Sequence, residues 1–120
     1  MLFAVPALPQ SPDNLSVKEV TCSSVTLAWN SSTDTTMTPV RSYVIQYRRN
    51  GSDDDYVETS VSKPEVTVGG LSAETDYEFQ VFSVNDVGRS ITAAFTVVTT
   101  SHTGQAITLF SFIFTRATLC

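Results

Sequence analysis

The chain has 120 residues, a net charge of −5, 42% apolar residues and 16% charged residues. This length suits one domain with short flanking segments, and the 32 Ser and Thr residues favour strands and turns over a helical bundle. The seven Lys and Arg residues are scattered, which excludes a nucleic-acid-binding face, because such a face needs clustered basic side chains.

Short runs of alternating apolar residues recur along the chain. They predict seven strands, at Leu15–Val20, Val25–Trp29, Ser42–Arg48, Tyr56–Ser60, Glu65–Val68, Asp76–Asn85 and Ile91–Thr100. Residues that bend the backbone or accept a positive φ fill the segments 31–39, 50–55, 69–76 and 85–90. The pattern predicts an all-β, seven-stranded β-sandwich.

Period-two alternation assigns each strand residue to one face of its sheet. The core is predicted to contain Leu15, Val17, Val25, Leu27, Trp29, Tyr43, Ile45, Tyr47, Val66, Val68, Leu71, Tyr77, Phe79, Val81 and Ser83. On the opposite face of the third and sixth strands, the residues expected to meet solvent or a partner are Val44, Gln46, Arg48, Glu78, Gln80, Phe82 and Val84. The last strand leaves two alternatives open: its core-facing side chains are either Phe95 and Val97 or Thr96 and Val98.

Several of these residues occur at the spacing of a known family. The run LSAETDYEFQVFSVNDVGRS, together with PDNLSV, VTLAW and SYVIQYR, resembles a fibronectin type III domain, an immunoglobulin-like β-sandwich, over residues 9–100. The structural signature consists of Trp29, Tyr43, Tyr47, Leu71 and Tyr77. The resemblance implies that Tyr77 forms the family's tyrosine corner, with its ring packed inward and its hydroxyl bonded to the backbone near residues 71–73.

Two departures and one finer similarity qualify this resemblance. The family often has Pro where this chain has Ala73, a change expected to leave the corner intact. The Arg-Gly-Asp tripeptide of the cell-binding fibronectin module is absent from NDVGRS, where Gly88 precedes Arg89, so the resemblance does not imply integrin binding by that route. The segments VTCSSVTLAW, IQYR and FSVNDVGRS are most similar to modules of neural adhesion receptors and LAR-type receptor protein tyrosine phosphatases.

Three of the four asparagines begin an Asn-x-Ser triplet and are candidate glycosylation sites. They are Asn14, Asn30 and Asn50, and all fall at expected strand edges or loops. This pattern favours an extracellular or cell-surface location for a glycoprotein. The alternative is that a chain rich in Ser and Thr acquires such triplets by chance, as in the cytosolic arrays of giant muscle proteins that use the same fold.

The residues that catalysis or metal binding would need do not occur in a recognisable arrangement. There is no Ser, His and acid set at plausible spacing and no glycine-rich phosphate loop, so we expect no enzyme and no cofactor. His102 has no Cys, Asp or Glu within ten residues and is expected to be a solvated linker residue. Asp53, Asp54 and Asp55 are consecutive, so their carboxylates cannot easily converge on calcium, and a solvated loop is expected.

The outward face of the third, sixth and seventh strands is the candidate contact surface. Its partner-binding candidates are Val44, Arg48, Phe82, Val84 and Arg89, with an exposed apolar patch expected among them. The alternative is that Val44 and Phe82 are ordinary strand-forming residues on a half-exposed sheet.

These observations predict a non-catalytic extracellular protein–protein recognition or spacer module of a cell-adhesion or receptor protein. Its partners would be a cell-surface or matrix protein or neighbouring domains of the same chain, and it would meet a membrane only through other parts of a parent protein. Two alternatives remain: a structural module of a cytosolic muscle-type array, and an ectodomain fragment of a receptor tyrosine phosphatase.

The segments flanking the domain are expected to lie outside it. Residues 1–8 form an apolar extension that is a poor signal peptide, because it lacks a basic start and contains a proline. Residues 101–120 are expected to be a linker and an apolar tail, whose ten uncharged residues from Ala106 to Thr115 are too few to span a bilayer. The stretch ITLFSFIF has high strand propensity, which suits either docking along a sheet edge or an end that replaces the next module of an array.

Overall fold

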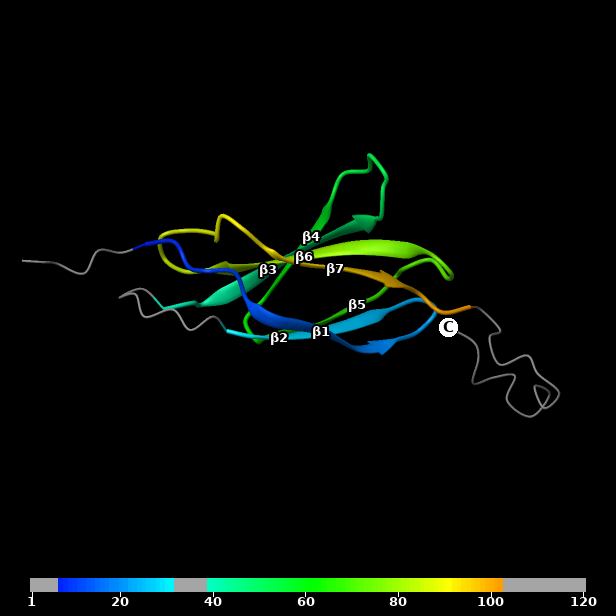
Figure 1. Cartoon of the computed structure of the whole chain (residues 1–120), viewed down its shortest axis with the longest axis horizontal. Helices are drawn as coiled ribbons and strands as arrows, with labels where there is room; N and C mark the ends of the chain where they lie inside the picture. The colour runs from blue at the N-terminus through cyan, green and yellow to red at the C-terminus, as the bar shows by residue number, and fades with distance from the viewer. Residues whose placement is uncertain (1–6, 32–38, 103–120) are drawn as a thin grey trace, which may run out of the picture.

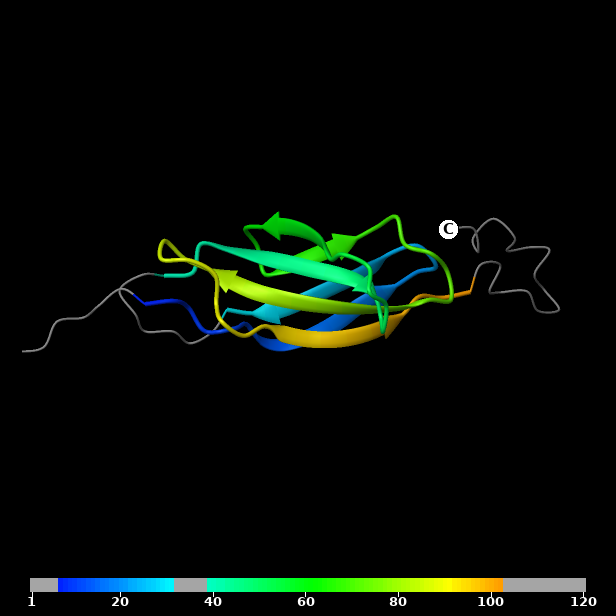
Figure 2. The ribbon, with the colours of Figure 1, turned by 90° about the horizontal axis from the view of Figure 1, so that it is seen from above.

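The computed structural model describes residues 7–31 and 39–102; residues 1–6, 32–38 and 103–120 lie outside the described part of the chain. Seven strands are present in the described residues: β1 (Asp13–Val20), β2 (Val25–Asn30), β3 (Ser42–Arg49), β4 (Val57–Val61), β5 (Glu65–Val68), β6 (Asp76–Val84) and β7 (Ala94–Thr99). They form two antiparallel sheets, ordered β1-β2-β5 and β4-β3-β6-β7. Figures 1 and 2 show the two layers packed face to face, which confirms the predicted seven-stranded sandwich.

The core lies between the two sheets and is built from the alternating apolar positions. Phe79, Leu27, Ile45, Val25 and Val81 are fully buried, because their strands pair with the apolar positions in register on one face. The other described members of the cluster are Trp29, Tyr43, Val66, Val68, Leu71, Tyr77 and Val98. Leu15 and Tyr47 are partly buried against this cluster. The core predicted from alternation is therefore largely confirmed.

Aromatic side chains lie toward both ends of the core. Trp29 of β2 meets Tyr43 of β3 edge to face, with ring centroids 5.3 Å apart, a geometry that aromatic pairs favour. At the other end Tyr77 is buried, and its hydroxyl accepts a hydrogen bond of 2.9 Å from the backbone N–H of Ser72. This is the contact that the tyrosine corner implies, and it forms although Ala73 stands where the family often has proline.

The structure corrects the core prediction at one residue of β1 and decides the orientation of β7, which the sequence left open. Val17 was expected in the core but is 41% exposed, although its register partner Leu27 is fully buried. The cause is its position on β1, an edge strand whose pairing with β2 shifts register twice. On β7 the second alternative is correct, since Thr96 and Val98 face inward opposite Phe79 and Tyr77 while Phe95 and Val97 face outward.

The two ends of the sandwich hold different sets of loops. At one end the N-terminal segment packs on the 85–90 loop, where the Asn85 amide donates to the carbonyl oxygen of Ala7 at 2.8 Å. At the other end the chain leaves β7 close to the β1–β2 turn, with the Ser101 N–H donating to the Thr21 carbonyl oxygen at 3.1 Å. The first and last described residues therefore lie at opposite ends of the long axis (Figure 1).

Candidate functional site

The outward face of the four-stranded sheet carries the candidate contact residues. Pairing across this sheet places Val44 beside Phe82 and Arg48 beside Glu78, with Phe95 of β7 beside Gln80. The strands therefore bring the predicted set together on one surface, as alternation requires.

Arg89 extends from the 85–90 loop across the middle of this face. Its guanidinium carbon lies 5.1 Å from the centre of the Phe82 ring, a distance suited to a cation–π contact. A guanidinium nitrogen reaches Glu58 on the far strand β4 at 3.2 Å. The Gln46 amide also donates to Glu58, at 2.7 Å, and this bond, followed by the one from Arg89, lowers the pKa of Glu58.

Beneath this cover Val44 is only 8% exposed, so the expectation that it meets solvent or a partner is wrong. The reason is tertiary: Val44 pairs with Phe82 on one side and Ser60 on the other, in the part of the sheet that Arg89 crosses. Phe82 is itself half-buried. The apolar pair at the centre of the candidate surface is therefore covered by the chain's own side chains.

A second polar cluster joins the β3–β4 loop to β6. Glu78 was expected to meet solvent or a partner, but it is 8% exposed and accepts hydrogen bonds from the Tyr56 hydroxyl at 2.6 Å and from Arg48 at 3.0 Å. The Arg48 guanidinium also stacks on the Tyr56 ring at 4.2 Å, and the Gln80 amide donates to the Tyr56 hydroxyl. The Tyr56 hydrogen bond is the main cause that lowers the pKa of Glu78, and the same bond raises the pKa of Tyr56.

Sequence reasoning did not assign Tyr56 and Glu58 to this face. Tyr56 was predicted to begin the fourth strand but lies in the loop before β4, and Glu58 looked like any exposed strand residue. The sequence holds no local signal for these contacts, because Glu58 pairs with Arg89 and Tyr56 bonds to Glu78, both far away along the chain.

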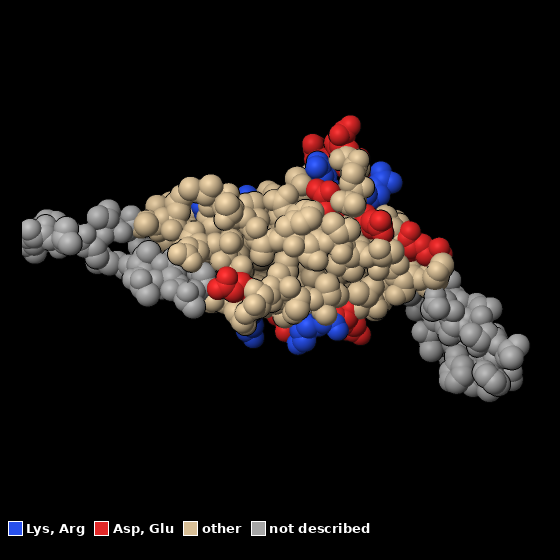
Figure 3. All heavy atoms as spheres, viewed as in Figure 1, with Lys and Arg blue, Asp and Glu red and all other residues tan. Residues whose placement is uncertain are grey.

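The exposed apolar side chains of the outward face lie at β7 and at the 85–91 end. Phe95 and Val97 on β7 are 57% and 42% exposed. Ile91 and Val87, beside the covered region, are also exposed, and Val84 is half-buried. Figure 3 shows the surface over β7 as a nearly uncharged band in the middle of the view, with most Lys, Arg, Asp and Glu above it, below it and toward its ends.

All three candidate glycosylation asparagines are exposed. Asn14 has a left-handed backbone (φ 55°) in the irregular start of β1, and Asn30 is the last residue of β2; Asp13 pairs with Asn30, so the two asparagines lie close together. Ser32, the third residue of the Asn30 triplet, lies outside the described residues.

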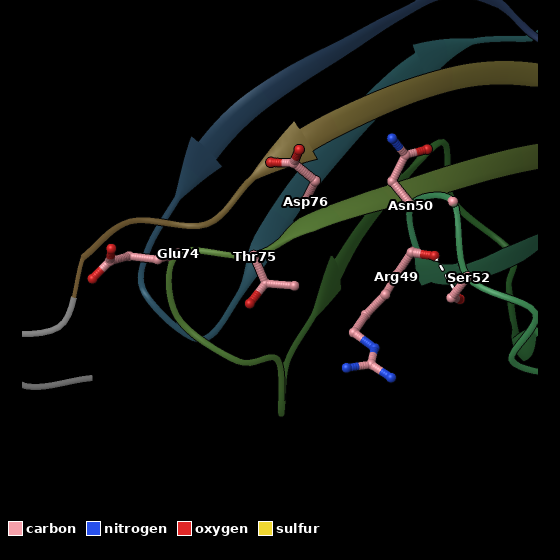
Figure 4. A pocket seen from close by; sticks show the side chains of 7 residues that line it. Arg49, Asn50, Ser52, Glu74, Thr75 and Asp76 are labelled. Carbon is pink, nitrogen blue, oxygen red and sulfur yellow. Dashed lines mark hydrogen bonds between the residues drawn. The ribbon is translucent and has the colours of Figure 1, made fainter.

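The third asparagine, Asn50, lies at the other end of the sandwich. It occupies a turn with Gly51, whose φ of 77° suits glycine, and it lines an open depression of about 420 Å³ (Figure 4). Arg49, Ser52, Glu74, Thr75 and Asp76 also line this depression.

Two residues weighed for metal binding have protein partners. His102 lies 2.6 Å from Glu74, a contact that their separation of 28 positions concealed in the sequence. Asp54 pairs with Arg49 at 3.1 Å, and within residues 7–31 and 39–102 no three His, Cys, Asp or Glu side chains are grouped as a metal site. The same residues form no helix of the length and apolarity that crossing a membrane requires.

With the fold and these surfaces established, the family can be assigned. The model of the fibronectin type III domain matches residues 10–100. The chain belongs to the fibronectin type III family. This confirms the resemblance read from the Trp29, Leu71 and Tyr77 motifs.

Curated relatives of this fibronectin type III domain include receptor-type tyrosine-protein phosphatases. It is 44% identical over 87 residues to receptor-type tyrosine-protein phosphatase F of Danio rerio, covering 72% of this chain and 4% of that protein. It is 34% identical over 100 residues to tyrosine-protein phosphatase Lar of Drosophila melanogaster, covering 82% of this chain and 5% of that protein. The chain thus spans about a twentieth of these two relatives, and the matched part of the chain is the fibronectin type III domain.

Solved structures agree on the fold. The FN5 domain of Drosophila Lar superposes with a TM-score of 0.63 at 23% identity, covering 78% of this chain and 98% of that one. The similarity to LAR-type receptor protein tyrosine phosphatases, which was predicted from the sequences of the strand segments, is confirmed.

Proposed function

We propose that this fibronectin type III domain is a non-catalytic recognition or spacer module of an extracellular receptor or adhesion protein. The observation that carries the proposal is the 44% identity to a receptor-type phosphatase across one domain that makes up 4% of that protein. In such a protein the phosphatase chemistry belongs to other parts of the chain. This module would contribute a rigid body with one neighbour at each end of its long axis.

The three exposed asparagines, each of which begins an Asn-x-Ser triplet, support an extracellular location. A glycan at Asn14, Asn30 or Asn50 would project from an edge or a turn without entering the core. The Asn50 glycan would stand at the rim of the depression in Figure 4, where polar side chains from two loops could contact its first sugar.

Expression behind a signal peptide in a secreting cell tests this location. We expect added glycan mass on at least one of the three asparagines, removed by the matching Asn→Gln substitution and by a glycosidase. Asn85 is an internal control, because it is 5% exposed and begins no Asn-x-Ser/Thr triplet. A secreted, folded module with all three asparagines unmodified would contradict the glycoprotein proposal.

The contact surface for a protein partner is proposed at the 85–91 end of the outward face. Arg89 and the half-buried Val84 come from the original candidate set, and the exposed Val87 and Ile91 extend it. Ile91→Ser is a suitable probe of this surface, because Ile91 is 83% exposed and its loss should leave the melting temperature unchanged.

Binding of the secreted module to a panel of purified cell-surface ectodomains would then be compared between the natural chain and Ile91→Ser. Thr67→Ser, on the exposed face of the other sheet, is the matched control. Equal binding by all three proteins would move the contact surface elsewhere, and loss of stability in Ile91→Ser would remove it as a probe of contact.

A further inference from the structure

Among the four sheet edges in the described part of the chain, the β7 edge is the unprotected one. Natural sheets protect edges with charges, irregular pairing or short strands. The β1 edge carries Lys18 and Glu19 and two register shifts, β5 is four residues long, and β4 bears Glu58 with its arginine partner. β7, with the sequence AFTVVT, has neither charge nor proline.

The ladder shows which backbone groups of β7 are open. The Thr100 N–H donates to the Thr75 carbonyl oxygen at 3.0 Å, and hydrogen-bonded pairs alternate with non-bonded pairs along an antiparallel ladder. Residues 94, 96 and 98 therefore bond to β6, and the N–H and C=O groups of Phe95, Val97 and Thr99 point away from it. These groups form a row to which another strand could bond.

Apolar side chains are exposed on both sides of this open row. On the outward side Phe95 and Val97 are 57% and 42% exposed. On the inward side Val17 is 41% exposed, although its partner Leu27 belongs to the core and β1 packs against β7. A strand seated at the edge of β7 would cover all three side chains, and it must be apolar on both of its own faces to do so.

The chain itself supplies such a strand shortly after β7. Residues 107–114, ITLFSFIF, lie outside the described part and contain no charge and no proline. One alternating set contains Ile107, Leu109 and Ile113, and the other contains Phe110, Phe112 and Phe114, so both faces are apolar, unlike an ordinary half-exposed strand. Residues 103–106 connect His102 to this segment, a length suited to a hairpin loop.

We propose that residues 107–114 pair antiparallel with the open edge of β7 as an additional strand of the four-stranded sheet. One alternating set lies beside Phe95 and Val97, and the other covers Val17. The tether favours this docking over a second molecule, because a short linker holds the segment at an effective concentration in the millimolar range.

Amide hydrogen exchange of the full chain, measured by NMR, tests the proposal. We expect the amides of Phe95, Val97 and Thr99 to exchange slowly, and Phe112→Asp to speed their exchange about tenfold or more while the amides bonded within the β6–β7 ladder keep their rates. Thr118→Asp, which adds the same charge outside the segment, should leave every rate unchanged.

A second pair of variants tests the β7 side. Val97→Lys should release residues 107–114 to rapid exchange, and Val57→Lys, at a 51% exposed position on the β4 edge, should not. Fast exchange of the three β7 amides in the natural chain would overturn the proposal. So would slow exchange that depends on protein concentration with the mass of a dimer in solution, because a second copy would then be the occupant.

Discussion

On the outward face of the four-stranded sheet, apolar residues over β3 and β6 are less exposed than those over β7. Over β3 and β6, Val44 is 8% exposed and Phe82 is half-buried, because Arg89 lies across the Phe82 ring and pairs with Glu58 beyond it. Over β7, Phe95 and Val97 have no such cover and are 57% and 42% exposed. An outward apolar position is therefore exposed or buried according to whether a long charged side chain can reach over it.

The largest effect on stability is expected in the covered region, the part over β3 and β6 that Arg89 crosses. The part over β7, with Phe95 and Val97, is the bare region. Phe82→Ser should lower the free energy of unfolding by about 2 kcal/mol, because it removes a half-buried ring and the cation–π contact of Arg89. Urea unfolding at neutral pH measures the change. A loss below about 0.5 kcal/mol would mean that the cover contributes nothing to stability and that Phe82 is free to serve a partner.

The second prediction removes the cover itself. Arg89→Ala should cost about 1 kcal/mol, since its ion pair is partly exposed and adds little beyond the contact with Phe82. The matched control is Arg41→Ala, whose pair with Asp86 at 2.7 Å is about 60% exposed on both sides and covers no ring; its cost should stay within about 0.5 kcal/mol. Equal losses in the two variants would assign the effect to charge alone.

The third prediction uses pH to weaken the polar clusters. The pKa values of Glu58 and Glu78 are lowered from 4.5 in the folded protein, so the folded state prefers both carboxylates ionised. Their contribution to stability is complete above pH 4.5 and is lost as the pH falls through the lowered values.

Urea unfolding across this acid range, compared between the natural chain and Glu78→Gln, isolates the part due to Glu78. The stability difference between the two proteins should shrink as the pH falls below 4.5, because the natural side chain then also becomes neutral. A constant difference over the whole range would show that the Tyr56 and Arg48 contacts do not depend on the charge of Glu78.

The smallest effect is expected on the bare region. Phe95→Ser should change the free energy of unfolding by less than about 1 kcal/mol, because the Phe95 ring is 57% exposed in the described sheet and its losses are limited to cross-strand contacts. The same measurement used for Phe82→Ser checks it. A cost as large as that of Phe82→Ser would erase the distinction between the two regions.

Several features were predictable because they depend on local pattern. Alternation placed Leu27, Ile45 and Phe79 in the core, and the turn residues separated seven strands whose ends moved by only a few residues. The Leu71 and Tyr77 spacing indicated the family and the corner. Alternation failed at Val17, because a sandwich edge exposes core-facing residues that an interior strand would bury.

The sequence by itself determined the fold, the family and the side chains that point outward, since each follows from a period of two and from motifs short enough to see in one dimension. Tertiary structure decided which outward side chains remain exposed. Arg89 and Glu58 are 31 positions apart and meet only because β4, β3 and β6 are neighbours, and their meeting covers Val44 and Phe82. β7 has no neighbour on its far side in the described sheet. Phe95 and Val97, which are apolar strand residues like Val44 and Phe82, therefore stay exposed there.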